Sequence, residues 1–164
     1  MILRFLGFCL MFLCPNILGS PLSNRADRIV ILKTAHTMTL YSGDRVLHQY
    51  KVALGRGPQG PKERQGDHKT PEGQYIVDSK NDHSRFHLAL HLSYPNTEDR
   101  NRAAQEHVNP GGDVEIHGLS PMFTFVGSLQ SEIDWTDGCI AVSNAEIEEI
   151  WKLVPVGTRV EILP

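Results

Sequence analysis

The sequence predicts a mixed α/β fold that is predominantly β, with a few short helices. Short runs of β-branched and other apolar residues recur along the chain, and turn residues separate them. One segment near the carboxyl end has helical spacing and its own capping signal instead. The chain of 164 residues is long enough for one domain with a hydrophobic core, and we place that domain at residues 25–164.

The first twenty residues differ from the rest of the chain. Arg4 provides a positive charge, an apolar run covers residues 5–13, and Gly19 and Ser20 are small residues of the kind that signal peptidase prefers. This layout predicts a signal peptide at residues 1–20 and export to the periplasm or cell envelope. The apolar run is shorter than the ~20 residues that span a bilayer. A retained N-terminal anchor is the alternative interpretation.

Cleavage of this segment would leave Cys139 as the single cysteine, because Cys9 and Cys14 lie within it. A single cysteine in an exported protein cannot form an intramolecular disulfide. Two interpretations remain at this point, a reactive thiol and a buried, inert side chain.

Seven segments have the composition of strands. Turn residues bound them, for example Ser42-Gly43-Asp44. In the fifth segment the apolar side chains alternate and would share one face of a sheet: Phe86, Leu88, Leu90 and Leu92. The predicted strands are residues 28–33, 37–41, 46–53, 74–78, 86–92, 114–117 and 159–163.

The helix near the carboxyl end begins with a capping box formed by Ser143 and Glu146. Pro155 ends it, and the apolar residues at helical spacing are expected to pack into the core: Ile147, Ile150, Trp151 and Val154. A second helix is predicted at residues 98–106. Residues 119–136 have no clear period and receive no assignment.

Residues 55–73 form a long irregular segment with five glycines and three prolines. Long loops of this kind in compact domains are usually functional or mobile. We expect this loop to line or cover a substrate cleft, and a surface insertion is the alternative.

Cys139 has the surroundings of a nucleophile. Gly138 precedes it and allows a tight backbone path, so the N–H groups of Gly138 and Cys139 could stabilise an oxyanion. A thiol with an ordinary pKa is only a few per cent thiolate at neutral pH and needs a base. His117 ends a predicted strand 22 residues earlier and is the candidate base.

Three motifs in this order resemble the catalytic domain of L,D-transpeptidases: Gly66–Gly73, Ile116-His117-Gly118 and Thr136–Ile140. The resemblance covers residues 28–163. It implies an L,D-transpeptidase-type β-sandwich or barrel, Cys139 as nucleophile, His117 as proton acceptor and donor, and no metal or organic cofactor. The residues that it marks as substrate-binding or supporting are Asp67, Thr70, Gly118, Thr136 and Asp137.

Two positions depart from the usual motif of this family. Asp137 stands where a histidine is usual, and Ala141 stands where arginine or asparagine is usual. These departures resemble a divergent branch that includes hydrolases of peptidoglycan-linked lipoprotein. The Asp137 carboxylate could act on the thiol or on His117, and a local bond to the backbone of its own turn is the alternative.

The resemblance implies acyl transfer from tetrapeptide stems of peptidoglycan, through an acyl-enzyme, in cell wall biogenesis or degradation and in cell shape. The alternatives are a hydrolase of the same fold (an L,D-carboxypeptidase, or one releasing wall-linked protein) and a non-catalytic wall-binding module. The expected partners are stem peptides, a wall-linked lipoprotein and carbapenem-type β-lactams as inhibitors. The chain is expected to be a monomer.

Two other function classes are disfavoured. The net charge of -3 provides no basic stripe for a nucleic acid. His83, His87 and His91 are spaced four residues apart, which raises the hypothesis of a metal site. In a strand that spacing separates side chains by about 13 Å, too far for one ion, so we predict histidines on a sheet face and no metal.

Overall fold

The computed structural model describes residues 24–164, and the expected signal peptide at residues 1–20 lies outside them. In chain order the elements are β1 (Arg28–Leu32), β2 (Thr37–Ser42), β3 (Arg45–Lys51), β4 (Gly73–Ser84), β5 (His87–Leu92), α1 (Thr97–Gln105), β6 (Glu115–His117), the 3-10 helix η1 (Pro121–Glu132), β7 (Ile140–Ala141), α2 (Asn144–Leu153) and β8 (Arg159–Leu163). The strands form one sheet in the order β3-β2-β1-β8-β4-β5-β6-β7. No helix in this part of the chain is long and apolar enough to cross a membrane.

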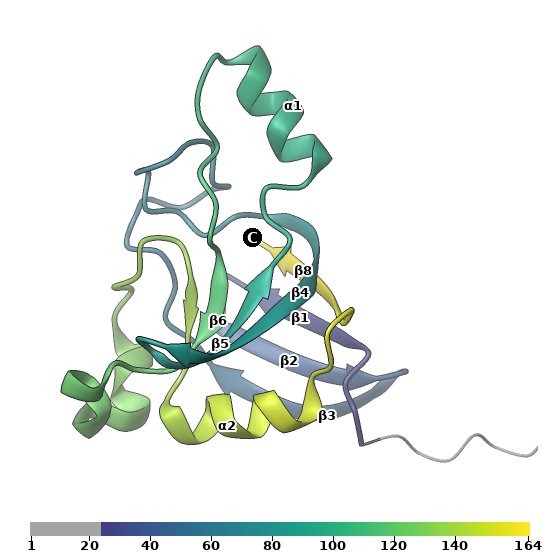
Figure 1. Ribbon diagram of the computed structural model, residues 1–164, viewed down its shortest axis with the longest axis vertical. Coiled ribbons are helices and arrows are strands. Elements are labelled where there is room, and N and C mark those ends of the chain that lie inside the picture. Colours follow the sequence, from purple (N-terminus) through teal and green to yellow (C-terminus); the bar gives the residue numbers. More distant parts are fainter. Residues whose placement is uncertain (1–23) are drawn as a thin grey trace, which may run out of the picture.

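The sheet curls until its two edges meet. Ala53 follows the edge strand β3 and forms an antiparallel bridge with Ala141 in β7, at the other edge, through hydrogen bonds of 3.0 and 2.9 Å. The result is a half-barrel, with α1 and α2 at opposite ends of the molecule (Figure 1). This architecture confirms the predicted mixed, predominantly β fold with short helices.

The concave side of the sheet holds the core, and α2 covers part of it. Ser143 and Glu146 form the predicted capping box, since the Ser143 N–H donates to the Glu146 carboxylate at 2.8 Å. The helix then presents Ile147 and Ile150, both fully buried, to the core. Full burial of one such side chain contributes about 1.5–3 kcal/mol, so this apolar face fixes the helix on the sheet.

The structure corrects several predicted element boundaries. β4 was predicted at residues 74–78 but continues to Ser84, because it pairs first with β8 and then with β5. The predicted strand 46–53 ends at Lys51, after which Ala53 turns to bridge β7. The predicted helix at 98–106 is confirmed as α1, and the unassigned stretch contains η1, which is kinked at Gly127.

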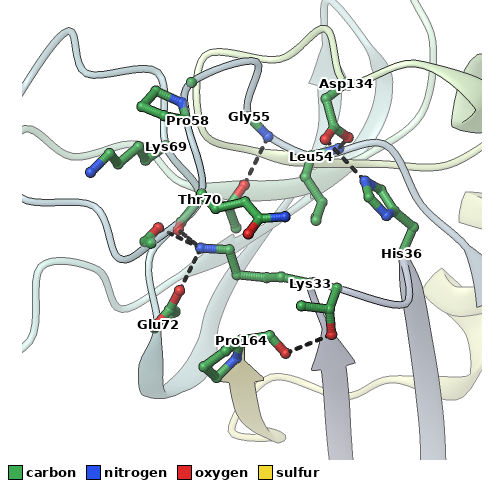
Figure 2. A pocket seen from close by; sticks show the side chains of 14 residues that line it. Lys33, His36, Leu54, Gly55, Pro58, Lys69, Thr70, Glu72, Asp134 and Pro164 are labelled. Atoms are coloured by element: carbon green, nitrogen blue, oxygen red, sulfur yellow. Dashed lines mark hydrogen bonds and ion pairs between the residues drawn. The ribbon is translucent and has the colours of Figure 1, made fainter.

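The loop at residues 55–73 is fastened by two lysines with many partners. The Lys33 ammonium donates to the carbonyls of Gly60 and Thr70 at 2.6 and 2.9 Å and to the Glu72 carboxylate at 2.8 Å (Figure 2). Lys62 forms a buried ion pair of 2.7 Å with Asp67. The glycine-rich loop is therefore an ordered wall and not a loose surface insertion.

Asp67 is the centre of this loop, and Asp67→Asn is expected to destabilise the protein by about 3 kcal/mol, because it leaves the Lys62 charge buried without its partner. Burial by itself raises the pKa of Asp67, but the Lys62 ammonium and the N–H groups of Glu63, Arg64 and Lys69 together hold the pKa well below its ordinary value. As pH falls, the Asp67 carboxylate therefore takes up a proton in the unfolded chain before it does so in the folded protein. Stability from Asp67 is present at neutral pH and decreases with acidification.

Thermal unfolding as a function of pH measures this effect. Asp67→Asn should lower the melting temperature at pH 7 by about 10 °C. The further decrease of the melting temperature in acid should be smaller in this variant than in the wild-type protein. Glu63→Gln is the matched control, since Glu63 is half-exposed and lies 3.6 Å from Lys69, and it should change stability by less than about 1 kcal/mol. Equal effects of both variants would contradict the assignment.

Candidate active site

The register of β6 and β7 places the cysteine and the histidine on the same face of the sheet. Ile116 pairs with Ile140 and His117 with Ala141 in this parallel ladder. Both isoleucines are fully buried in the core. Because side chains alternate along a strand, Cys139, which directly precedes β7, lies on the same face as His117. The predicted pair is thus brought together as diagonal neighbours across two strands.

His117, the candidate base, is buried, and a hydrogen bond orients its ring. Its Nδ1 lies 2.7 Å from the Gly118 carbonyl oxygen. A carbonyl can only accept a hydrogen bond, so Nδ1 carries the proton and Nε2 is the basic nitrogen. The imidazole stacks on Phe86 at 4.3 Å between ring centroids and meets the Trp135 ring edge-on at 5.9 Å.

This environment keeps the His117 imidazole neutral. Burial lowers the pKa of His117 to about 4, the Gly118 hydrogen bond opposes the shift, and the Arg85 charge adds to it. At neutral pH the ring is therefore unprotonated and ready to accept a proton at Nε2.

The residue after His117 has to be a glycine for a steric reason. A Cβ on Gly118 would lie 2.6 Å from Oδ1 of Asn144, which accepts a hydrogen bond from the Leu119 N–H at 2.7 Å. Gly118 therefore supports the site by letting the first residue of α2 approach the end of β6.

The Cys139 thiol is protonated in the resting structure. Its Sγ donates to the Asp113 carbonyl at 3.5 Å. Burial raises the pKa of the Cys139 thiol to about 11, a hydrogen bond from the Glu115 N–H opposes the shift, and the carboxylates of Glu115, Asp137 and Asp113 add to it. The resting pair is therefore a thiol and a neutral imidazole.

The rate of Cys139 alkylation by iodoacetamide should therefore rise about tenfold per pH unit from pH 6 to pH 9, following the thiolate fraction of a thiol whose pKa is about 11. Stopped-flow or mass-spectrometric labelling measures this profile directly. An ion pair of thiolate and imidazolium would instead give a plateau across neutral pH, and that plateau would refute the neutral resting pair.

Thr136 holds the turn that contains Cys139, the candidate nucleophile. Its hydroxyl accepts from the Gly138 N–H at 3.1 Å and donates to the Cys139 carbonyl at 2.7 Å. Gly138 has a φ of 129°, and a Cβ there would lie 2.7 Å from the Lys69 carbonyl oxygen, so only glycine fits. The Gly138 N–H is thus bonded to the Thr136 hydroxyl in this structure, and the expectation that the N–H groups of Gly138 and Cys139 stabilise an oxyanion stays a prediction.

Asp137 connects the nucleophile turn to the loop at residues 55–73. Its carboxylate pairs with Arg56 at 2.8 Å and with Nδ1 of His68 at 2.7 Å. These described contacts are neither the bond to His117 nor the local turn bond that the sequence suggested. The carboxylate does contribute to the raised pKa of Cys139, as a nearby negative charge should.

A cavity of about 370 Å³ opens in front of Cys139. The loop at 55–73 and the segment at 109–114 bound it, and they are joined by hydrogen bonds between Gln65 and Asn109 of 2.7 and 2.8 Å. The glycine-rich loop thus lines the cleft, as expected. The lining residues are Lys62, Gln65, Gly66, His68, Arg85, Gly111, Gly112, Asp113, Val114, Asp137, Gly138 and Cys139.

The other side of the same loop borders a second cavity of about 210 Å³, which contains Thr70 (Figure 2). Thr70 is buried, and its hydroxyl accepts from the Gly55 N–H at 2.9 Å. Thr70 and Asp67 lie outside the lining of the Cys139 cavity, and the described side-chain hydrogen bonds of both are with the loop itself.

Sequence reasoning missed four residues around the pair. Glu115 alternates with His117 in Val-Glu-Ile-His, and that period could have placed it on the catalytic face. Trp135 stands beside the cysteine motif. Arg85 and Phe86 had no sequence signal, because they reach His117 only through the pairing of β4, β5 and β6.

The three histidines at four-residue spacing do not converge. His83 lies in β4, whereas His87 and His91 lie in β5, and their nearest carboxylates are Asp82, Glu148 and Asp78 respectively. Within residues 24–164, no group of three His, Cys, Asp or Glu side chains is arranged to hold a metal ion. Independence from metal stays a prediction for the assay below.

The comparisons with known proteins agree with this geometry. The family model YkuD, L,D-transpeptidase catalytic domain, matches residues 26–162. A candidate L,D-transpeptidase of Escherichia coli K12, YafK, is 33% identical over 145 residues, which cover 85% of this chain and 49% of YafK. The chain thus spans about half the length of this relative.

Solved structures show the same fold. The helical cell shape determining protein Pgp2 from Campylobacter jejuni superposes with a TM-score of 0.65 at 26% identity, covering 84% of this chain and 47% of Pgp2. L,D-transpeptidase 3 from Mycobacterium tuberculosis, in complex with a faropenem-derived adduct, superposes with a TM-score of 0.57 at 16% identity, covering 85% of this chain and 60% of that one. At 16% identity, the similarity to the second structure shows a common fold and nothing further.

Proposed function

Because the chain belongs to the L,D-transpeptidase catalytic domain family, we propose that it catalyses cysteine acyl transfer on tetrapeptide stems of peptidoglycan. The observation that carries the proposal is the placement of Cys139 and His117 on one sheet face, with Nδ1 of His117 fixed by a carbonyl and a cavity in front of the thiol. These are the parts that a thiol nucleophile with a general base requires.

In the proposed reaction, Sγ of Cys139 attacks the carbonyl at the L-centre of the diamino acid, and the thiol proton moves to Nε2 of His117. The Cys139 N–H donates to the oxyanion that forms. Collapse of this intermediate breaks the peptide bond, and the departing D-alanine amine takes the proton from His117. A thioester remains on Cys139, and the imidazole is neutral again.

We propose the side-chain amine of a second stem, or of a lipoprotein lysine, as acceptor: it attacks the thioester and loses a proton to His117. Hydrolysis by water is the second candidate. The observation that favours it is the departure from the family motif at Asp137 and Ala141, which resembles a branch with hydrolases. Asp137 lines the cavity and is paired with Arg56 and His68.

The proposal includes the place of action and the inhibitors. Peptidoglycan lies outside the cytoplasm, and the charged and apolar pattern of residues 1–20 is that of an export signal. A carbapenem carries a strained acyl group that a thiol can open, so we propose that Cys139 is acylated by such β-lactams.

Incubation of the protein with purified tetrapeptide muropeptides, followed by mass spectrometry, tests the function. Cross-linked dimers with released D-alanine would support transpeptidation. Tripeptides without cross-linked dimers would show that the activity is hydrolysis. Activity should persist in excess chelator. The absence of any product, together with the absence of a carbapenem adduct on Cys139, would overturn acyl transfer and favour a wall-binding module.

A further inference from the structure

Arg85 is a cation of the Cys139 cavity that forms no ion pair at contact distance with any residue of the described range 24–164. Burial raises the pKa of the Glu115 carboxyl, and the Arg85 charge acts on that group and opposes the shift. Lys62, also in the lining, is neutralised by Asp67 at 2.7 Å. Arg85 stacks on the Phe86 ring, with the guanidinium carbon 4.7 Å from the ring centroid. Among the contacts that the structure gives for residues 24–164, none is an ion pair of Arg85 with a carboxylate.

The guanidinium is held near the catalytic base. Phe86 contacts Arg85 and also stacks on the His117 imidazole, at 4.3 Å between centroids and 22° between planes. Stacking on an aromatic ring fixes the plane of a guanidinium and leaves its N–H edge free to donate. Arg85 can therefore offer two parallel donors to a ligand in the cavity in front of Cys139.

The proposed substrate brings an anion to this position. His117 protonates the amine of the leaving D-alanine, and only one carbon separates that amine from the terminal carboxylate. A carboxylate so close to His117 needs a cation, because Asp113 and Asp137 also line the cavity. Ala141 is fully buried and supplies no charge at the motif position where the family usually has arginine or asparagine.

We propose that Arg85 is a specificity-determining residue that binds the terminal carboxylate of the leaving D-amino acid. This inference rests on the proposed function, since it assumes a stem that ends in a free carboxylate. A bidentate pair between guanidinium and carboxylate is among the stronger hydrogen-bonded contacts, and it would select tetrapeptide stems over stems with a blocked end.

The experiment compares two donors that differ only at the end, a tetrapeptide with D-alanine and one with D-alaninamide. The wild-type protein should prefer the free acid, and Arg85→Gln should lower kcat/KM for it by about 10- to 100-fold while changing the amide less than about threefold. Arg85→Lys should retain part of the preference. Arg28→Gln is the matched control, because Arg28 also stacks on an aromatic ring, that of Tyr41 at 4.3 Å, but lies in β1 and outside this cavity.

A second readout separates this inference from the function. Iodoacetate is negatively charged and iodoacetamide is neutral, but both alkylate the same thiol. A cation beside Cys139 therefore raises the ratio of the iodoacetate rate to the iodoacetamide rate. Arg85→Gln should lower that ratio several-fold, and Arg28→Gln should leave it unchanged. An unchanged ratio in Arg85→Gln, or an equal loss on both donors, overturns the role of Arg85. A lowered ratio of alkylation rates in Arg85→Gln, without turnover of either donor by the wild-type protein, overturns the proposed function but supports an anion-binding site at Arg85.

Discussion

Replacement of Cys139 by serine is expected to abolish muropeptide turnover while the fold stays intact. Serine is nearly isosteric, and its hydroxyl can still donate to the Asp113 carbonyl that the thiol contacts at 3.5 Å. The hydroxyl has a much higher pKa than a thiol, however, and His117, whose pKa is about 4, is too weak a base to remove its proton. Product formation by mass spectrometry and the melting temperature are the two measurements.

Cys139→Ala serves as the control without any nucleophile. Both variants should melt within a few degrees of the wild-type protein and form no carbapenem adduct. Residual turnover in Cys139→Ser above roughly a tenth of the wild-type rate would remove Cys139 from the nucleophile role.

Loss of the base is the second large effect. His117→Ala should lower the rate by at least about 10²-fold, the usual contribution of general acid–base catalysis. Because His117 is buried between Phe86 and Trp135, the alanine variant also leaves a cavity. His117→Gln therefore accompanies it, since glutamine fills more of the space but cannot accept the proton.

The matched control for the base is His87→Gln, which removes an exposed imidazole that pairs with Glu148 at 2.8 Å. It should retain turnover within about twofold. Unchanged turnover in the His117 variants would point to another base.

The pH dependence provides a further check on the same residue. His117 acts as a base only while it is unprotonated, and its pKa of about 4 keeps it so down to mildly acidic pH. The acidic limb of kcat/KM should therefore fall near pH 4 and not near the ordinary histidine value of 6.5. A limb near 6.5 in the intact protein would contradict a buried, neutral imidazole.

Local patterns in the sequence were sufficient for most of the elements and for the candidate nucleophile and base. The period of the β-branched runs predicted most strands, and the capping box at Ser143 and Glu146 predicted where α2 begins. These signals involve residues that are close along the chain. Cys139 and His117 were recognisable because each stands in a short motif, and the chemistry of a thiol requires a base.

Contacts between distant segments were decided only by the tertiary structure. The sequence suggested a bond from Asp137 to His117 or to its own turn, but the folded loop places Arg56 and His68 beside it. Arg85 lies near His117, with the Phe86 ring in contact with both, only because β4, β5 and β6 pair side by side, an arrangement set by sheet register. The shifted pKa values of His117 and Cys139 arise mainly from burial, and burial depends on the whole packed core. The sequence by itself therefore determined which groups are the candidate nucleophile and base, and the tertiary structure determined their protonation states and their neighbours, because these depend on burial and on contacts between distant segments.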